Sequence, residues 1–384
     1  MTAPAGFQDD EKTRVVEGAG ALAQLGVHAR ALGGARVFLV SDPGVVRAGH
    51  GPRAAALLRA AGLTVQEFSE VGENPSTEDV ARGLERARAF RPDLFVAVGG
   101  GSPIDAAKGV NFLLVCGGAM RDYWGHDKAT KPLLPLIAVP TTAGTGSEVQ
   151  SFALISDAET HRKMACGDPS AAPRIALLDP ELTLSMPPFV TACTGLDTLA
   201  HAVESAVSRP RNERSRAYSR AAFSAAYAAL PRVLADPRDL DARAAMLRAA
   251  ALAGLAIEHS MLGAAHSMAN PLTAHHGVPH GQAVGTLLPH VVRFNALDEG
   301  ARGEYLELAR LADLAGSSDP VAALADGLGA LVSRAGLPAG LAALGVAAAD
   351  VPRLAAESAQ QWTAGFNPRS VVGADFEVLL LAAL

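Results

Sequence analysis

The sequence predicts an α/β domain followed by an all-helical domain, with a Rossmann-like, mainly parallel sheet in the first. Short apolar runs alternate with helix-length segments through the first half of the chain, which is typical of βαβ units. Beyond about Asp179 and Pro180 the strand-like runs disappear, and stretches rich in Ala, Leu and Arg take over. A chain of 384 residues exceeds the size at which a single core usually stops growing. We therefore expect two domains, at residues 1–187 and 188–384.

The individual elements follow from these patterns. Apolar runs bounded by turn residues predict strands at 36–40, 64–68, 94–98 and 134–139. Helical patterns separate the early strands at 51–61 and 78–90. In the second half, the predicted helices are 215–234, 240–259, 303–315 and 321–335.

Composition excludes several classes of protein. The net charge is −6 and there is no basic tract, so nucleic acid is not an expected partner. Cys116, Cys166 and Cys193 are odd in number and scattered, which argues against a disulfide framework. Residues 1–12 lack the apolar region of a secretory signal, and no apolar run reaches the ~18 residues that a membrane helix needs. We expect a cytoplasmic protein.

A glycine-rich turn directly follows the apolar strand that ends at residue 98. Gly100 and Gly101 permit close approach of the backbone to a ligand, and a helix that begins there presents its N-terminus to a phosphate. Ser102 is expected to cap this helix, and Asp105, three residues later, to complete a capping box. The glycine spacing is not G-x-G-x-x-G, so a tight strand-to-helix turn without a ligand is an equal alternative.

A second glycine loop follows the strand predicted at 134–139. The hydroxyls of Thr141, Thr142, Thr145 and Ser147 offer donors and acceptors to a sugar or a carboxamide. Glu148 stands three residues after Thr145, and we expect it to cap a helix.

Asp42 lies just beyond the first predicted strand of the α/β half. A carboxylate at this position can accept hydrogen bonds from both hydroxyls of an adenosine ribose, and it would repel a 2′-phosphate. In a nucleotide-binding fold it therefore favours NAD over NADP. The alternative is a turn-forming role in Ser-Asp-Pro-Gly.

The strongest chemical signal is the pair Asp197 and His201. Four residues apart in a helix expected to begin at Gly195, their side chains share one face and can reach a common ion. His266 and His280 lie in a stretch, 259–290, that holds six of the eleven histidines. One carboxylate with several imidazoles suits Zn²⁺ or Fe²⁺. An isolated Asp–His pair would more often be solvated, and the two further histidines are what favour a metal site.

Together these motifs resemble the iron-containing, or group III, alcohol dehydrogenase family. The resemblance runs from the N-terminal strands to at least Asn295, and it implies a dehydroquinate synthase-like architecture with a nucleotide-binding domain and a helical metal-binding domain. It implies that the metal ligands, which form the catalytic group, are Asp197, His201, His266 and His280. It also implies that the residues lining the nucleotide are Asp42, Asn74, Gly100, Gly101, Ser102, Asp105, Thr141, Thr142 and Lys163.

The same resemblance implies a function. The expected reaction is hydride transfer between NAD and a small alcohol or aldehyde, with Fe²⁺ favoured as the metal, Zn²⁺ also suitable, and a homodimer as the assembly. One alternative is a related polyol dehydrogenase of the glycerol type. Another is a metal- and nucleotide-binding homologue with little catalysis, because Asn270 stands where many relatives have a histidine.

Overall fold

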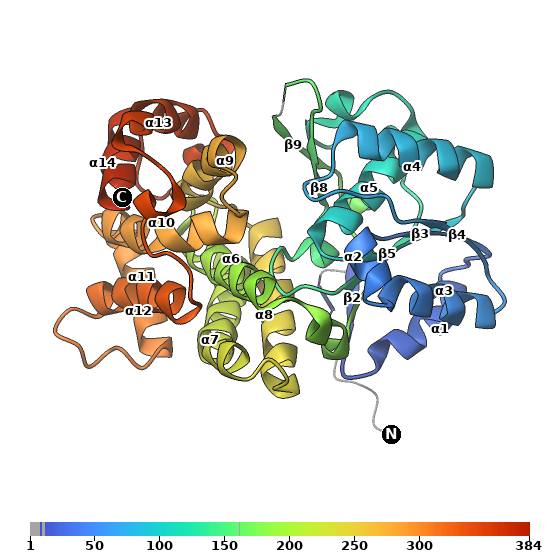
Figure 1. The fold of residues 1–384 in the computed structure, drawn as a ribbon, viewed down its shortest axis with the longest axis horizontal. Coiled ribbons are helices and arrows are strands. Elements are labelled where there is room, and N and C mark those ends of the chain that lie inside the picture. The colour runs from blue at the N-terminus through green and yellow to red at the C-terminus, as the bar shows by residue number, and fades with distance from the viewer. Residues whose placement is uncertain (1–7, 10–11, 161) are drawn as a thin grey trace. The chain divides into compact units, whose positions relative to one another are not determined.

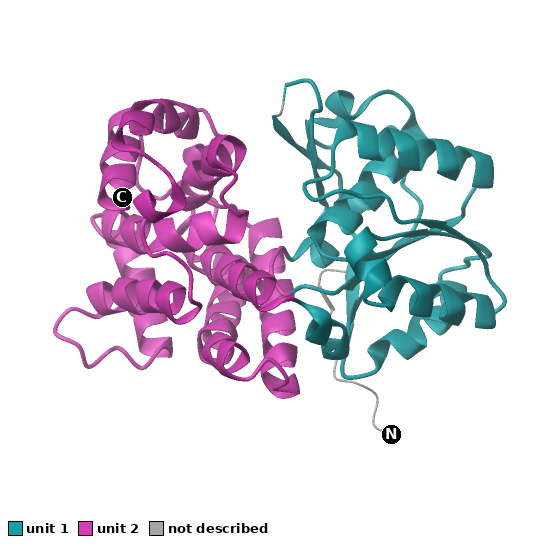
Figure 2. Ribbon diagram, in the orientation of Figure 1, with its two compact units in different colours: residues 1–142, 146–186 teal, residues 143–145, 187–384 magenta. Residues whose placement is uncertain are grey.

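The computed structural model describes residues 8–9, 12–160 and 162–384, and the chain divides into two compact units (Figures 1 and 2). Unit 1 comprises residues 1–142 and 146–186, and unit 2 comprises residues 143–145 and 187–384. The main boundary between the units falls after residue 186, and the boundary expected from the sequence falls one residue later, after residue 187. No sequence pattern indicates that residues 143–145 belong with the helical unit.

Unit 1 is built on a seven-stranded sheet with the order β1-β2-β10-β7-β5-β3-β4. All neighbouring strands pair in parallel except β1, which is antiparallel to β2. The predicted parallel sheet is therefore confirmed. Its strands are β1 (Gln8–Asp9), β2 (Thr13–Glu17), β3 (Arg36–Val40), β4 (Thr64–Phe68), β5 (Leu94–Gly99), β7 (Leu136–Pro140) and β10 (Ile175–Leu178).

Helices cover both faces of this sheet (Figure 1). Because successive side chains of a strand point to opposite faces, β3 contributes to two cores. Phe38 and Val40 are buried with apolar residues of α4 and α5, whereas Val37 and Leu39 are buried with those of α1 and α3. The helices of unit 1 are α1 (Leu25–Ala31), α2 (Pro43–Arg47), α3 (His50–Ala60), α4 (Thr77–Phe90) and α5 (Gly101–Cys116).

A second, three-stranded sheet in unit 1 was not expected from the sequence. It has the order β6-β9-β8, formed by β6 (Gly125–His126), β9 (Lys163–Gly167) and β8 (Phe152–Ser156). The β8 and β9 strands form an antiparallel pair. These strands are short and no helix separates β8 from β9, so the alternation that revealed the large sheet gives no signal here.

Unit 2 is built of helices, as predicted. Four of them, α7, α8, α11 and α12, lie within four residues of the ranges expected from the sequence. The helices are α6 (Pro188–Val207), α7 (Glu213–Ala235), α8 (Leu240–Glu258), α9 (Ala264–His276), α10 (His280–Asn295), α11 (Glu299–Leu311), α12 (Pro320–Arg334), α13 (Val351–Ala359) and α14 (Gly373–Ala382). Within the described residues, none of the helices has both the length and the apolar character needed to cross a bilayer.

One boundary prediction was wrong. The helix that carries Asp197 begins at Pro188, so Gly195 lies in its interior and not at its start. A Cβ on Gly195 would lie 2.4 Å from the Leu230 side chain of α7, which shows that the glycine permits close packing of two helices.

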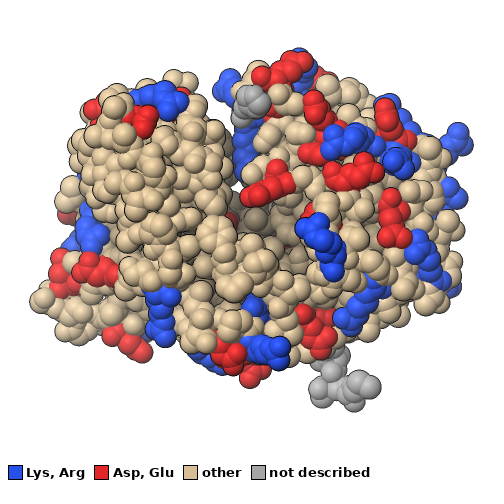
Figure 3. Space-filling model, viewed as in Figure 1, with Lys and Arg blue, Asp and Glu red and all other residues tan. Residues whose placement is uncertain are grey.

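On the face shown in Figure 3, Lys and Arg side chains are interspersed with Asp and Glu over unit 1, and much of unit 2 carries uncharged residues. This face therefore presents charges of both signs and not a single basic field.

Candidate functional site

The order of the large sheet reverses beside β3. The chain passes from β3 to β4 on one side and returns to place β5 on the other side of β3. In open α/β sheets, a crevice forms outside the carboxyl ends of the strands at such a reversal, and nucleotides bind there. Three groups predicted to bind the cofactor follow neighbouring strands at this edge: Asp42 after β3, Gly100 and Gly101 after β5, and Thr141 and Thr142 after β7.

The glycine turn is tightly packed at this edge. A Cβ on Gly100 would lie 3.1 Å from the Thr142 hydroxyl oxygen, and one on Gly99 would lie 3.2 Å from an Asp42 carboxylate oxygen. Gly99 also has a φ of 152°, which disfavours other residues. The structure thus brings Asp42, the glycine turn and Thr142 together.

The cap predicted for α5 was wrong. The N-cap residue is Gly100, which has no side chain, and Ser102 lies inside the first turn. The Ser102 hydroxyl instead accepts a hydrogen bond from the Asn74 amide at 3.2 Å, and Lys163 Nζ donates to Asn74 Oδ1 at 3.2 Å. Asn74 itself adopts a left-handed φ of 53°. Three of the predicted cofactor residues are therefore linked to one another, while the amides that begin α5 are not capped by their own N-cap residue.

Asp105 and Ser147 are held within unit 1 by each other. The buried Asp105 carboxylate accepts from the Ser147 hydroxyl and from the Leu154 amide, the latter at 3.1 Å, so it does not complete a capping box. Burial raises the pKa of Asp105, and the nearby Lys108 opposes this. Thr145, in the segment grouped with unit 2, is exposed. Nucleotide binding by these residues stays a prediction.

Lys108 is a buried cation whose role the sequence did not reveal. Its Nζ donates to the backbone carbonyls of Ser147, Gln150 and Phe152, each at 2.8 Å. It therefore fixes the loop that follows β7. Glu148 lies in this loop within a short 3-10 turn. The expectation that it caps an α-helix was wrong. Its Oε1 is buried without a hydrogen-bond partner among the described residues. Burial raises the pKa of Glu148 to about 7.

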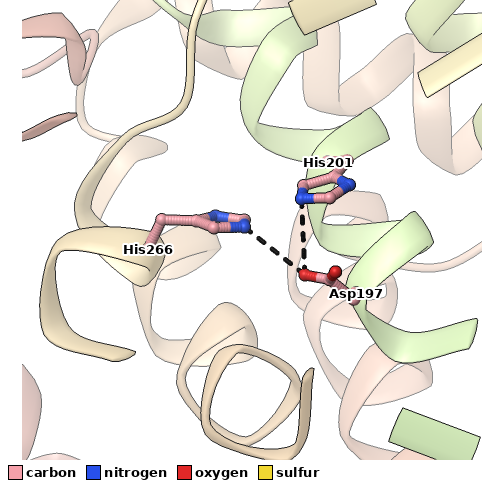
Figure 4. A group of neighbouring side chains, drawn as sticks. All are labelled: Asp197, His201 and His266. Atoms are coloured by element: carbon pink, nitrogen blue, oxygen red, sulfur yellow. Dashed lines mark ion pairs between the residues drawn. The ribbon is translucent and has the colours of Figure 1, made fainter. Parts of the chain in front are cut away.

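In unit 2, the four predicted metal ligands come together from three helices. Asp197 and His201 lie on α6, His266 on α9, and His280 is the first residue of α10. Asp197 Oδ1 lies 3.4 Å from His201 Nε2, 3.5 Å from His266 Nε2 and 3.9 Å from His280 Nε2. Figure 4 shows Asp197 with His201 and His266 turned toward one another. Asp197, His201 and His266 are all buried, whereas the His280 side chain is 28% exposed.

The donor set fits a divalent ion. Within the described part of the chain, Asp197 Oδ1 and His266 Nε2 are buried and have no hydrogen-bond partner. Bonds of about 2.1 Å in a tetrahedral site place neighbouring ligand atoms about 3.4 Å apart. The separations of Asp197 Oδ1 from His201 and His266 match this value, and that from His280 is wider. A carboxylate with three imidazoles suits Fe²⁺ or Zn²⁺.

The same geometry shifts the pKa values of the group. Burial alone would raise the pKa of Asp197, but the neighbouring imidazoles, His201 first, lower it well below its ordinary value. Burial lowers the pKa of His201, with Asp197 opposing. Burial also acts to lower the pKa of His266, yet its contacts with Asp197 and Glu204 outweigh this and raise the pKa to about 9.

Glu204 is the member of this site that sequence reasoning missed. Its Oε2 lies 2.5 Å from His266 Nδ1, on the side of the ring opposite Asp197. The signal was present, because Glu204 follows His201 by three residues and therefore lies on the same face of α6.

Asn270 lies one turn after His266 on α9. Its Nδ2 donates to Gln361 Oε1 at 3.0 Å. Nearby, His275 Nε2 lies 2.7 Å from a carboxylate oxygen of Glu357 on α13. His275 therefore contacts a carboxylate away from the predicted metal ligands.

Comparisons with known proteins agree along the whole chain. A family model described as iron-containing alcohol dehydrogenase matches residues 12–180, and one described as Fe-containing alcohol dehydrogenase family, C-terminal, matches residues 191–384. Alcohol dehydrogenase 4 of Schizosaccharomyces pombe is 39% identical over 298 residues, which cover 78% of this chain and 69% of that protein. The NAD-dependent methanol dehydrogenase of Bacillus methanolicus is 31% identical over 376 residues, covering 96% and 97%.

Solved structures give the same result. A 1,3-propanediol oxidoreductase superimposes with a TM-score of 0.93 at 33% identity, covering 96% of this chain and 97% of the other. Sulfoacetaldehyde reductase from Bifidobacterium kashiwanohense, solved in complex with NAD⁺, superimposes with a TM-score of 0.87 at 29% identity, covering 98% of each chain.

Proposed function

Because this chain belongs to the iron-containing alcohol dehydrogenase family, we propose that it transfers hydride between NAD and a small aliphatic alcohol or aldehyde at the residues described above. The resemblance recognised in the motifs is thereby confirmed. Curated relatives act on methanol, propanediol and lactaldehyde, as their names state, and this chain is an alcohol or aldehyde oxidoreductase of the same class. The observation that carries the proposal is the convergence of three imidazoles on Asp197 Oδ1.

In this proposal, the metal is held by Asp197, His201, His266 and His280. The family favours Fe²⁺, and the same donors accept Zn²⁺. A bound divalent ion supplies a Lewis acid for the substrate oxygen. Oxidation then releases a hydride from the alcohol carbon to NAD⁺ and a proton from the hydroxyl, which gives the carbonyl compound and NADH. The chain's own residues hold the ligands in place and exclude solvent from Asp197.

The nucleotide in this proposal lies at the carboxyl edge of the large sheet. The Gly100 turn and the amides that begin α5 receive the phosphates, and Asp42 accepts hydrogen bonds from the adenosine ribose. Asp42 already accepts a hydrogen bond from the Val45 amide at 2.9 Å, which fixes its side chain at the start of α2. A fixed carboxylate there would repel a 2′-phosphate, so NAD is preferred to NADP.

Asn270 bears on the proton-transfer step of the proposed reaction and not on hydride transfer. An amide neither gives up nor takes a proton near neutral pH. Many relatives have a histidine at this position, which can help to move the proton. In the proposed reaction, water or a ribose hydroxyl carries the proton instead. Since Asn270 is none of the four ligands, metal binding does not depend on it.

We further propose a cytoplasmic homodimer. Within the described residues, none of the cysteines Cys116, Cys166 and Cys193 forms a disulfide, in keeping with a reducing compartment. Size-exclusion chromatography with light scattering tests the assembly.

The central experiment compares H266A with H275A. The two histidines lie on the same helix, but only His266 faces Asp197. After reconstitution with Fe²⁺ or Zn²⁺, we expect H266A to lose bound metal and NAD-linked turnover across a panel of alcohols and aldehydes, and H275A to keep both. Full activity and unchanged metal content in H266A would refute the ligand assignment. Metal and NADH binding by the wild-type protein without turnover of any member of the panel would refute the proposed reaction.

A further inference from the structure

The helix that carries His266 has no cap of its own. The N-cap residue of α9 is Gly263, which offers no side chain to the amides of the first turn. Two side chains from distant parts of unit 2 take over this role. Asn367 Oδ1 accepts from the Ala264 amide at 3.2 Å, and Glu204 Oε1 accepts from the Ala265 amide at 2.8 Å. The start of α9 is thus fixed from outside the helix.

Gly263 leaves the space that both caps need. A Cβ at this position would lie 2.8 Å from Asn367 Oδ1 and 3.1 Å from Glu204 Oε1. Any larger residue would therefore push against the two acceptors at once. The glycine, the amide and the carboxylate form one arrangement around the first turn of α9.

Glu204 uses its second oxygen on His266. Oε2 lies 2.5 Å from Nδ1, and the Glu204 side chain is 2% exposed, so solvent does not compete for it. A carboxylate only accepts hydrogen bonds, which places the ring hydrogen on Nδ1. The other ring nitrogen, Nε2, faces Asp197 at 3.5 Å, so it is the nitrogen that gives up its proton when a metal binds.

We propose that Glu204 is a positioning residue that holds His266 in its Nδ1–H form, so that Nε2 is ready to bind the metal. This inference rests on the proposed metal site. A single helix, α6, then supplies two ligands and the group that orients a third. Carboxylates that accept from the outer nitrogen of a metal-binding histidine fix its tautomer and its ring orientation in the same way at other metal sites.

A purely structural role for Glu204 makes a different prediction. If Glu204 only caps α9, then glutamine can replace it, because one amide oxygen is enough for the Ala265 amide. If Glu204 also orients His266, glutamine must fail. It has one acceptor oxygen for two N–H donors, and with that oxygen on Ala265 its NH₂ group faces Nδ1. The ring would then carry its hydrogen on Nε2, where a metal cannot bind.

The experiment compares wild type, E204Q, E204D and N367A. Asn367 is the control for affinity, because it caps the same helix turn without a hydrogen bond to His266, although it also pairs with Asn295. The Zn²⁺ dissociation constant is measured by chelator competition, and thermal unfolding is followed in the metal-free protein. The His266 tautomer is read from ¹⁵N shifts of histidine-labelled metal-free protein through a pH titration that reaches the neutral ring. We expect E204Q to raise the dissociation constant about 10–100-fold, with partial rescue in E204D. We expect N367A to lower the unfolding temperature with little change in affinity.

Two results would overturn the inference. One is an E204Q protein that binds Zn²⁺ as tightly as wild type while its unfolding temperature falls as in N367A. The other is an Nε2–H tautomer of His266 in the wild-type protein, a measurement that needs no variant to fold. If wild type takes up no Zn²⁺ or Fe²⁺ at all, the proposed function fails instead, and the wild-type tautomer alone then decides the role of Glu204.

Discussion

Replacing Gly281 with alanine is expected to damage the proposed metal site through the backbone. Gly281 follows His280 at the start of α10. A Cβ there would lie 2.1 Å from the carbonyl oxygen of Cys193 on α6 and 3.3 Å from Asp197 Cβ. Real Cβ atoms essentially never approach closer than 3.0 Å, so the two helices must separate by about 0.9 Å or more at this point. A backbone carbonyl cannot rotate away as a flexible side chain can.

The size of the effect follows from that displacement. Metal sites hold their ligand distances within about 0.2 Å, so a shift of this size moves His280 well outside the range that the other ligands define. We expect the Zn²⁺ affinity to fall at least about tenfold. Overpacking costs about 1–3 kcal/mol, and for a domain of this size each kcal/mol lowers the unfolding temperature by about 2–4 °C. Metal-free G281A should therefore unfold about 2–12 °C below wild type.

Gly285 provides the matched control, one turn further along α10. A Cβ there would meet the Leu196 side chain at 3.0 Å, and that side chain can adjust. Chelator competition and thermal unfolding are measured for both variants. G285A is expected to lose some stability while keeping its metal affinity. If G281A has the same unfolding temperature and the same Zn²⁺ affinity as wild type, the close contact between α10 and the backbone of α6 does not set the geometry of the proposed ligands.

Three further changes test unit 1. In D42S, the serine can still accept from the Val45 amide but the charge is gone, so kcat/KM with NADPH relative to NADH should rise about tenfold, and an unchanged ratio would contradict the ribose assignment. Burial raises the pKa of Glu148 from 4.5 to about 7, so the folded state keeps a proton that the unfolded state has already lost between these pH values. Stability should therefore fall by about 3 kcal/mol as pH rises from 4.5 to 7, and urea titrations of E148Q should lack this component of the slope. K108M should lose about 3 kcal/mol, since three buried or partly buried carbonyls lose their donor, and urea unfolding at a single pH measures this.

The sequence predicted what periodicity and chain order determine. Alternating side chains on β3 enter two different cores, so both faces of the strand are buried. A strand of this kind has a nearly continuous apolar sequence, which is why the run at 36–40 could be recognised. The pair Asp197 and His201 was visible because a helix places residues four apart on one face. The contribution of His266 and His280 to the same site came from the family resemblance, since no local pattern fixes where three helices meet.

The errors share a physical cause, because each depends on contacts between distant segments. Ser102 has the composition of a cap, yet its hydroxyl accepts from Asn74, and Gly100 is the N-cap residue. Gly195 has the composition of a helix start, yet it lies inside α6, where Leu230 packs closely against it. Local propensity is a weak guide wherever tertiary packing supplies the partner.

Close packing on α6 accounts for three of the glycines inside helices of unit 2. Gly195, Gly281 and Gly285 each face a neighbour that a Cβ would crowd, although glycine in a helix costs about 1 kcal/mol relative to alanine. Propensity alone predicts that alanine at these positions stabilises the protein, whereas the contacts predict the opposite. The separation of the helices fixes the separation of the proposed ligands they carry, so this cost in helix propensity is what allows His280 to approach Asp197. In a metal site whose ligands come from several helices, the distances between ligand atoms depend on how closely the helix backbones pack.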